Sequence, residues 1–491
     1  MKSINSFKLG IIALTIILLP ACTKDFEEEN NDPNAITSVT PDLVLPGILR
    51  SSLSQMVNEG WGTGNLVVQQ TAKYQFVDED RYLWGNKSGL WNSMYSTLRD
   101  VNVLIDLSET SNQPEYKGIA LIMKSWMFSI LTDAYGDVPY TEATKALEGI
   151  FTPKYDPQEQ IYEGILLDLE EANALLVTSN GVPRGDLIYQ GNLLKWRKLA
   201  NSLKLRYLMR ISDRKDVKGP MQAILDDPST YPVFENNTDD GVYTYYAAAP
   251  NQFPNYTMRI GSFDEVRLSQ KMESTLEAFN DPRITVFARP TSASANTSTP
   301  VYTGMPNGLS DTEALNYNGG SNNISRVGQL YFEGSITPEG LQVAKGYIMA
   351  YPELQFILAE AESKNLISTE KTAQQYYEDG IKGSFIYFNE PMPADYLTRT
   401  GVAFNEATAL RQIGTQKWIA LFFSGLEAWF DWRRTGEPTI IPGPDNQNNN
   451  RVPVRYKYPL NEQSQNAENL QEVIQRQGPD DINTKVWWDK Q

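Results

Sequence analysis

The sequence predicts a mainly α-helical protein, built from pairs of helices, with an irregular and aromatic-rich lobe inserted among them. Three observations support this fold class. The composition is that of an ordinary globular protein, with 41% apolar and 21% charged residues in a chain of 491. Apolar residues recur every three to five positions over long segments, as in a helix with one buried face. Residues 231–340 lack this period and are rich in tyrosine, asparagine, serine, threonine, glycine and proline.

Each predicted helix is a segment in which apolar side chains form one stripe. In the first, Leu45, Ile48, Leu49 and Leu53 recur at helical spacing. The predicted helices cover residues 41–56, 91–107, 116–134, 158–176, 193–210, 347–365, 369–388 and 406–434. Short turns between them favour antiparallel pairs, which are typical of a tetratricopeptide-like stack, although no clean repeat of about 34 residues is present.

The first residues of the chain are predicted to form a signal peptide. Lys2 and Lys8 precede an apolar stretch over residues 9–19. This stretch has about half of the ~20 residues that a transmembrane helix needs, so a membrane span is the poorer interpretation. The predicted signal peptide covers residues 1–21.

Cys22 is the only cysteine of the chain. A single cysteine forms no intramolecular disulfide, no CxxC redox pair and no thiolate cage for a metal. Residues 19–22 resemble a bacterial lipobox, which implies that Cys22 is lipidated and becomes the N-terminus after cleavage. Several acyl chains on one cysteine hold a protein firmly on a membrane. Cys22 is therefore the predicted lipid anchor.

Residues 22–40 follow as a polar, acidic segment that cannot bury apolar area and is predicted to be a flexible tether. Its acidic run resembles the surface-export signal of Bacteroidetes lipoproteins. A plain solubilising linker is the alternative interpretation.

Charge and composition exclude several classes of function. The chain has 43 basic and 60 acidic residues, a formal charge of −17, which repels phosphate backbones and makes nucleic acid an unsuitable partner. It contains no histidine, which removes the usual general base of hydrolases and the imidazole ligand of zinc, copper and iron sites. We therefore expect no cofactor.

Several passages together carry a resemblance to a known family. They are residues 31–34, 131–140, 351–361 and 416–436. These passages resemble the SusD and RagB family of outer-membrane nutrient-binding lipoproteins of Bacteroidetes, and the resemblance spans nearly all of the mature chain.

The resemblance implies a fold and a role. The implied fold is a right-handed stack of tetratricopeptide-like helix pairs over residues 41–491, in which the irregular insert at about 231–340 forms the binding face. The implied role is non-enzymatic capture of an oligosaccharide or a peptide at the cell surface. The implied partner is a SusC-like TonB-dependent outer-membrane transporter, to which the ligand is delivered.

The family-like passages themselves are predicted to pack rather than to bind. In the predicted helix over residues 417–434, Trp418, Leu421 and Trp429 fall on one face, and Gly425 permits a close approach of neighbouring backbone. The glycine and proline of residues 136–139 are expected to end the helix before them.

Two segments are predicted to display aromatic side chains for a ligand. One covers residues 61–84 and the other residues 243–331, and both mix aromatic rings with Asn, Gln, Asp and Arg. Flat aromatic faces suit the apolar faces of sugars, and amides pair with hydroxyl groups. The alternative is that these rings fill gaps between helices. The candidate ligand-binding residues are Trp61, Tyr74, Tyr82, Trp84, Tyr245, Tyr246 and Tyr256.

Three other functions stay open at this point. A glycoside hydrolase needs only two carboxylates, which Glu427 and Asp431 could supply four positions apart, although ion pairing is the commoner use of such residues. Residues 236–241 resemble the start of a calcium-binding EF-hand loop, but the twelfth position of that loop is Ala247 instead of glutamate. A structural surface lipoprotein would have the same anchor and helices, with its aromatic residues buried or dispersed.

Overall fold

The computed structural model describes residues 39–246, 249, 251–258, 262–333 and 344–490. The predicted signal peptide, Cys22 and nearly all of the predicted tether lie outside the described residues. The chain from Pro41 to Gln491 forms one unit. Its described part is mainly helical, which confirms the predicted fold class. Among the described residues, no helix combines the length and the apolar content that crossing a bilayer requires.

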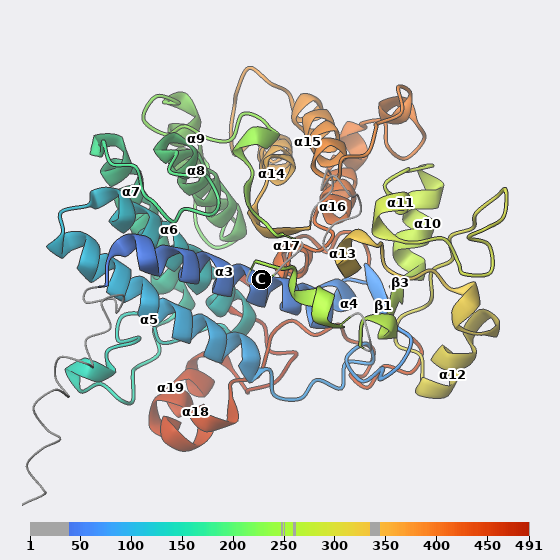
Figure 1. Cartoon of the computed structure of the whole chain (residues 1–491), viewed down its shortest axis with the longest axis horizontal. Helices are drawn as coiled ribbons and strands as arrows, with labels where there is room; N and C mark the ends of the chain where they lie inside the picture. Colours follow the sequence, from blue (N-terminus) through green and yellow to red (C-terminus); the bar gives the residue numbers. More distant parts are fainter. Residues whose placement is uncertain (1–38, 247–248, 250, 259–261, 334–343, 491) are drawn as a thin grey trace, which may run out of the picture. The chain divides into compact units, whose positions relative to one another are not determined.

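The N-terminal helices pack side by side, each against the next (Figure 1). They are α3 (Pro41–Glu59), α5 (Ser88–Thr110), α6 (Pro114–Tyr135), α7 (Gln158–Thr178) and α8 (Leu193–Arg210), followed by the shorter α9 (Lys218–Asp226). Helix α5 buries a single stripe, whereas α6 lies between α5 and α7 and buries nearly all of its residues. At Gly136, with φ of 92°, α6 ends as the sequence predicts.

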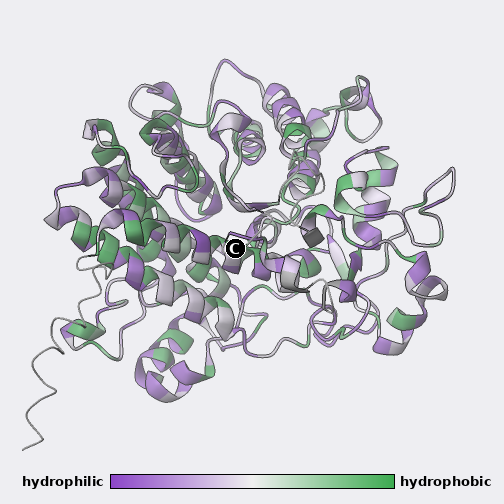
Figure 2. Cartoon of the chain, viewed as in Figure 1, coloured by the Kyte–Doolittle hydropathy of each residue, from purple (hydrophilic) through white to green (hydrophobic). Residues whose placement is uncertain are grey.

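The C-terminal helices form a second group around α14. Helix α14 packs against α15, α16 and α8. The group comprises α14 (Tyr351–Ser363), α15 (Ala373–Tyr387), α16 (Ala409–Ala420) and α17 (Glu427–Thr435), followed by α18 (Leu460–Gln465) and α19 (Ala467–Gln477). Figure 2 shows that α18 and α19 are largely hydrophilic, and α19 buries only Leu470, Val473 and Gln477.

Two predicted helices differ from the structure by more than a shift of their end residues. The predicted helix over residues 347–365 begins only at Tyr351, because Lys345–Met349 form the buried strand β4. The predicted helix over residues 406–434 is two helices, α16 and α17. Between them Phe423 and Gly425 have φ of 63° and 74°, in the left-handed region that a continuing helix excludes.

The insert contains short strands and helices that the sequence pattern does not reveal. Strand β2 (Gly241–Thr244) pairs antiparallel with β4, and β3 (Val266–Leu268) pairs antiparallel with β1 (Thr71–Lys73). The short helices of the insert are α10 (Gln270–Ala278), α11 (Ile284–Phe287), α12 (Asp311–Asn316) and α13 (Leu330–Glu333), and the short α4 (Asn65–Val67) precedes β1 in the chain. We call α4, α10–α13, β1 and β3, with the loops that join them, the lobe (Figure 1).

Candidate functional site

The structure joins the two aromatic segments that the sequence singles out. Strand β1 lies in the first segment and β3 in the second, and they pair with Thr71 opposite Leu268. The loop after β1 is also tied to the insert, because Asn307 Nδ2 donates a 2.6 Å hydrogen bond to the carboxylate of Asp80. Both segments therefore contribute to the lobe.

Four of the seven candidate residues are buried. The exposed fractions are 6% for Trp61, 3% for Tyr82, 7% for Trp84 and 1% for Tyr245. Their rings pack against protein: Trp61 lies 6.0 Å from Phe423 between ring centroids, and Trp84 lies edge-on to Trp429 and Tyr456. In this conformation these four present little surface to a ligand.

The other three candidates reach the surface to different degrees. Tyr246 is 64% exposed, whereas Tyr74 and Tyr256 are half-buried. The Tyr74 hydroxyl donates to the Leu315 carbonyl at 3.2 Å, and the guanidinium of buried Arg267 lies 4.7 Å from the centre of its ring.

One exposed aromatic residue in the first segment was not among the candidates. Phe76 is 72% exposed and has a left-handed φ of 53°. Its neighbours Gln75 and Asp78 are also exposed. A phenylalanine among polar residues is the only sequence signal that could have singled it out.

Around Tyr246 the structure gathers the side chains that a sugar-binding surface needs. The Tyr246 N–H donates to the Asn251 carbonyl at 2.7 Å, and Arg50 Nη1 of α3 donates to Asn251 Oδ1 at 3.3 Å. Gln252 forms a β-bridge with Tyr246. We call Tyr246, Arg50, Asn251 and Gln252 the Tyr246 surface. It combines an exposed ring with a guanidinium and two amides, which can stack on a sugar and pair with its hydroxyl groups.

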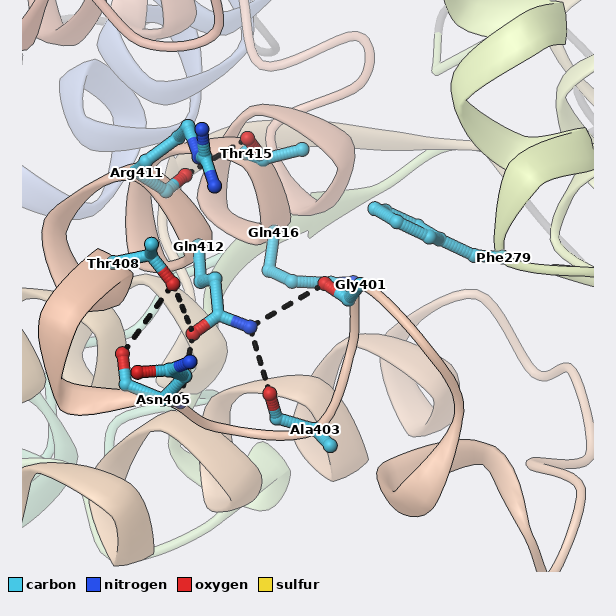
Figure 3. A pocket seen from close by; sticks show the side chains of 9 residues that line it. All are labelled: Phe279, Gly401, Ala403, Asn405, Thr408, Arg411, Gln412, Thr415 and Gln416. Carbon is cyan, nitrogen blue, oxygen red and sulfur yellow. Dashed lines mark hydrogen bonds between the residues drawn. The ribbon is translucent and has the colours of Figure 1, made fainter.

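A separate hollow lies between α10 and α16 (Figure 3). Its volume is about 420 Å³, within the usual size range of ligand pockets. It is lined by Phe279, Gly401, Ala403, Asn405, Thr408, Arg411, Gln412, Thr415 and Gln416. Sequence periodicity cannot reveal it, because its walls come from positions far apart in the chain.

The two carboxylates of the hydrolase alternative are engaged in ion pairs. Glu427 pairs with Arg210, and Asp431 accepts from Lys417 Nζ at 2.8 Å and from Arg434 Nη2 at 2.9 Å. Burial alone would raise the pKa of Asp431, but the charges of Lys417, Arg434 and Arg210 outweigh it and hold the pKa well below its usual range. A carboxylate held ionised in this way is a poor general acid.

The residues of the EF-hand-like stretch have protein partners. Asp239 accepts from Lys198 Nζ at 2.9 Å, and Asp240 accepts from the Tyr351 N–H at 2.7 Å. Within the described ranges, no group of three or more Cys, Asp or Glu residues is arranged to hold a metal ion.

Comparison with known proteins identifies a family. A family model named SusD-like and described as "starch-binding associating with outer membrane" matches residues 33–459. No curated protein matches the sequence.

Solved structures share the fold. A chitin-binding protein has 28% identity and a TM-score of 0.78, and the match covers 92% of this chain and 100% of that one. A SusD homologue from Bacteroides fragilis has 27% identity, the same TM-score and the same coverage of both chains. A chitin-binding SusD homologue from Flavobacterium johnsoniae has 23% identity and a TM-score of 0.73, and the match covers 90% of this chain and 98% of that one.

Proposed function

The chain belongs to the SusD-like family, and from this premise we propose that it is a nutrient-binding protein that captures glycans at the outer membrane. The observation that carries the proposal is the family match over residues 33–459, with its description as starch-binding and associating with the outer membrane. A structural neighbour at 28% identity is a chitin-binding protein, which favours a glycan over a peptide as the ligand. The family is one of carbohydrate-binding proteins rather than of enzymes, and the pairing of Glu427 and Asp431 with cations is consistent with this.

The proposal includes how the protein reaches its place of action. Residues 1–21 serve as a signal peptide, and lipidated Cys22 anchors the mature chain on the surface of the outer membrane through the tether of residues 22–40. The captured ligand passes to a SusC-like TonB-dependent transporter. The lipobox-like sequence around Cys22 supports the anchor, and the family membership supports the transporter.

We place the ligand on the Tyr246 surface. Its support is the exposure of Tyr246, whose backbone pairs with Asn251 and Gln252, together with the hydrogen bond from Arg50 to Asn251. Half-buried Tyr256 and Tyr74 contribute at the edges of the bound ligand. The buried candidates Trp61, Tyr82, Trp84 and Tyr245 act indirectly in this proposal, by fixing the loops that carry the exposed residues.

Calorimetric titration with starch-derived and chitin-derived oligosaccharides and with peptides tests the proposal. We expect saturable glycan binding without formation of a product. Tyr246→Ala should weaken it about tenfold, since it removes a stacking ring. Phe151→Ala is the matched control, because Phe151 is an aromatic residue that is 79% exposed outside the lobe, and binding should not change. Breakdown of a ligand would favour the hydrolase, and the absence of binding to any of these ligands would favour a structural lipoprotein.

A further inference from the structure

The hollow between α10 and α16 has walls that are already fixed in place. Gln412 on α16 is 8% exposed, and its Nε2 donates to the carbonyls of Ala403 at 2.7 Å and Gly401 at 3.4 Å. Its Oε1 accepts from the Asn405 N–H at 2.9 Å. The loop over residues 401–408 is therefore wrapped around one buried amide, as Figure 3 shows. A ligand would order little that is not ordered already, which favours binding.

The second amide of α16 anchors the floor of the hollow to the core. Gln416, one turn after Gln412, is 1% exposed. Its Oε1 accepts from Arg283 Nη2 at 3.0 Å, and Arg283 in turn pairs with Asp281 in a fully buried ion pair. Among the described residues, its Nε2 makes a single hydrogen bond, a long one that it donates to the Tyr396 hydroxyl at 3.4 Å.

The wall opposite α16 is an aromatic ring. Phe279 lies at the end of α10 and is half-buried, and Figure 3 shows its ring reaching toward Gly401 and Gln416. A Cβ atom at Gly401 would lie 2.8 Å from Phe279 Cε1, so glycine lets the loop backbone approach the edge of the ring. The hollow thus has one apolar face and one polar face.

The amide and guanidinium groups of the polar face leave mainly donors available to a ligand. The side-chain oxygens of Gln412, Gln416 and Asn405 already accept hydrogen bonds from within the protein. In the described part of the chain, the Arg411 guanidinium and Asn405 Nδ2 donate to no protein group. A ligand that pairs with these two groups must bring acceptors, whereas the Thr408 and Thr415 hydroxyls, which donate within the protein, can still accept from its hydroxyl groups.

The charge of the hollow is unusual for this chain. Of the described residues that line it, Arg411 alone is charged, in a protein with a formal charge of −17. Four other hollows of similar size in the described residues each include carboxylates: Glu273 and Glu277; Glu273, Glu277 and Asp281; Glu362 and Glu406; and Glu163 and Glu170. Burial raises the pKa of Glu437 and the charge of Arg411 opposes this, but the two side chains form no ion pair.

We propose that this hollow binds the carboxylate-bearing residue of an acidic oligosaccharide. The carboxylate lies against the Arg411 guanidinium, which matches it with two parallel hydrogen bonds, and the apolar face of the sugar ring lies against Phe279. This inference rests on the proposed glycan-binding function and adds to it a second site, separate from the Tyr246 surface, that prefers uronates. The aromatic wall favours a sugar over the C-terminus of a peptide, whose main chain offers a carboxylate without a flat apolar ring face.

The test compares two ligands that differ only in charge. The purified protein is titrated calorimetrically with a uronate trisaccharide and with the same trisaccharide after its carboxylates are reduced to alcohols. We expect the uronate to bind about tenfold tighter or more, and the difference to shrink as salt is added. Arg411→Gln should abolish the difference and leave the affinity for the neutral sugar. Phe279→Leu keeps the apolar volume but removes the ring face, and should weaken binding of the uronate to the hollow.

The controls separate this inference from the proposed function. Arg99→Gln replaces an exposed arginine on α5 outside the hollow and should leave both affinities unchanged. Because Arg411 is exposed, its variant should unfold at the same temperature as the wild type. Three outcomes would each overturn the inference: equal affinity for the two sugars, a preference that survives Arg411→Gln, or tighter Arg411-dependent binding of a short peptide through its C-terminus. In each of these cases, binding of the neutral glycan would still support the proposed function. Failure to bind any glycan would overturn both.

Discussion

Trp84 and Tyr246 lie in segments of similar composition, yet 7% of Trp84 and 64% of Tyr246 is exposed. The difference comes from distant partners. The Trp84 ring lies 5.7 Å from Trp429 and 5.5 Å from Tyr456 between centroids, and both partners come from the C-terminal part of the chain. A local pattern can therefore predict which segments carry aromatic residues, but not which of their rings remain at the surface.

Replacing Trp84 and Tyr246 should show, by the effect on stability, which ring belongs to the core and which to the surface. Trp84→Ala removes a buried ring and should lower the free energy of unfolding by about 3–5 kcal/mol. Tyr246→Ala removes an exposed ring and should change it by less than about 0.5 kcal/mol, although we expect it to weaken glycan binding. Urea denaturation followed by circular dichroism measures both. A stable Trp84→Ala variant with impaired glycan binding would instead place Trp84 at the ligand.

Asp240 is a buried carboxylate whose titration affects stability. Burial raises its pKa to about 6, even though the Tyr351 N–H, the Asn237 amide and Lys345 favour the ionised form. The folded state therefore binds this proton more tightly than the unfolded state, in which the pKa is about 4. The contribution of Asp240 to stability is greatest below about pH 4 and is lost as the pH rises through about 6.

Asp240→Asn should remove this dependence. Asparagine stays neutral, as protonated Asp240 does, and its carbonyl can still accept from the Tyr351 N–H. Between pH 4 and pH 6.5, the wild type should lose up to about 3 kcal/mol of unfolding free energy relative to the variant, at about 1.4 kcal/mol for each unit of pKa shift. Urea unfolding curves at several pH values measure the difference. Parallel pH profiles for the two proteins would contradict the raised pKa.

Among the elements, the boundary between α16 and α17 shows why the chain turns where the sequence predicts one helix. Gly425 lies in this turn with its backbone against the short π-helix Gly60–Gly64 that follows α3. A Cβ atom at Gly64 would lie 2.0 Å from the Gly425 carbonyl oxygen. The prediction of a close approach at Gly425 identified the right residue, but a turn rather than a helix makes the contact.

Alanine at two glycines of the same π-helix should therefore act differently. Gly64→Ala places a methyl group against backbone that cannot move aside, and should destabilise the protein by more than about 2 kcal/mol. Gly62→Ala is the matched control, because a Cβ atom at Gly62 would meet nothing within 4 Å. Thermal and urea unfolding compare the two variants. Equal effects would show that helix propensity, and not the contact with Gly425, decides the outcome.

The accuracy of the predicted elements depends on their length. The helix predicted over residues 193–210 has the bounds of α8, because eighteen residues are enough for an apolar stripe to repeat. In the lobe, α11 and α13 have four residues each, about one turn, in which no period can be seen. The hollow between α10 and α16 escapes prediction for a related reason, since packing between distant elements forms it.

For the molecule as a whole, the family-like passages meet in a buried network of charges. They contribute Asp133 on α6, Glu353 on α14 and Glu427 on α17, and α8 supplies Arg206 and Arg210. Arg206 Nε donates to Glu353 Oε1 at 2.6 Å. The sequence could identify the family from these passages and predict that they pack. It could not show that their charges pair with α8, because that pairing depends on how the helices assemble.

The Arg206–Glu353 pair should couple the two groups of helices strongly. Its side chains are 3% and 1% exposed, and Arg206 also donates to the Ile348 carbonyl. Arg206→Met should lower the free energy of unfolding by about 3–5 kcal/mol, because it leaves the Glu353 charge buried without its partner. Glu353→Gln should destabilise the Arg206→Met variant less than it destabilises the wild type. The difference, measured in a double-mutant cycle, should be a coupling energy of at least about 2 kcal/mol. The control cycle uses Arg399 and Asp395, an ion pair in which Asp395 is 68% exposed, and its coupling should be close to zero. Additive effects at Arg206 and Glu353 would mean that apolar packing between α8 and α14, rather than the ion pair, holds the two groups together.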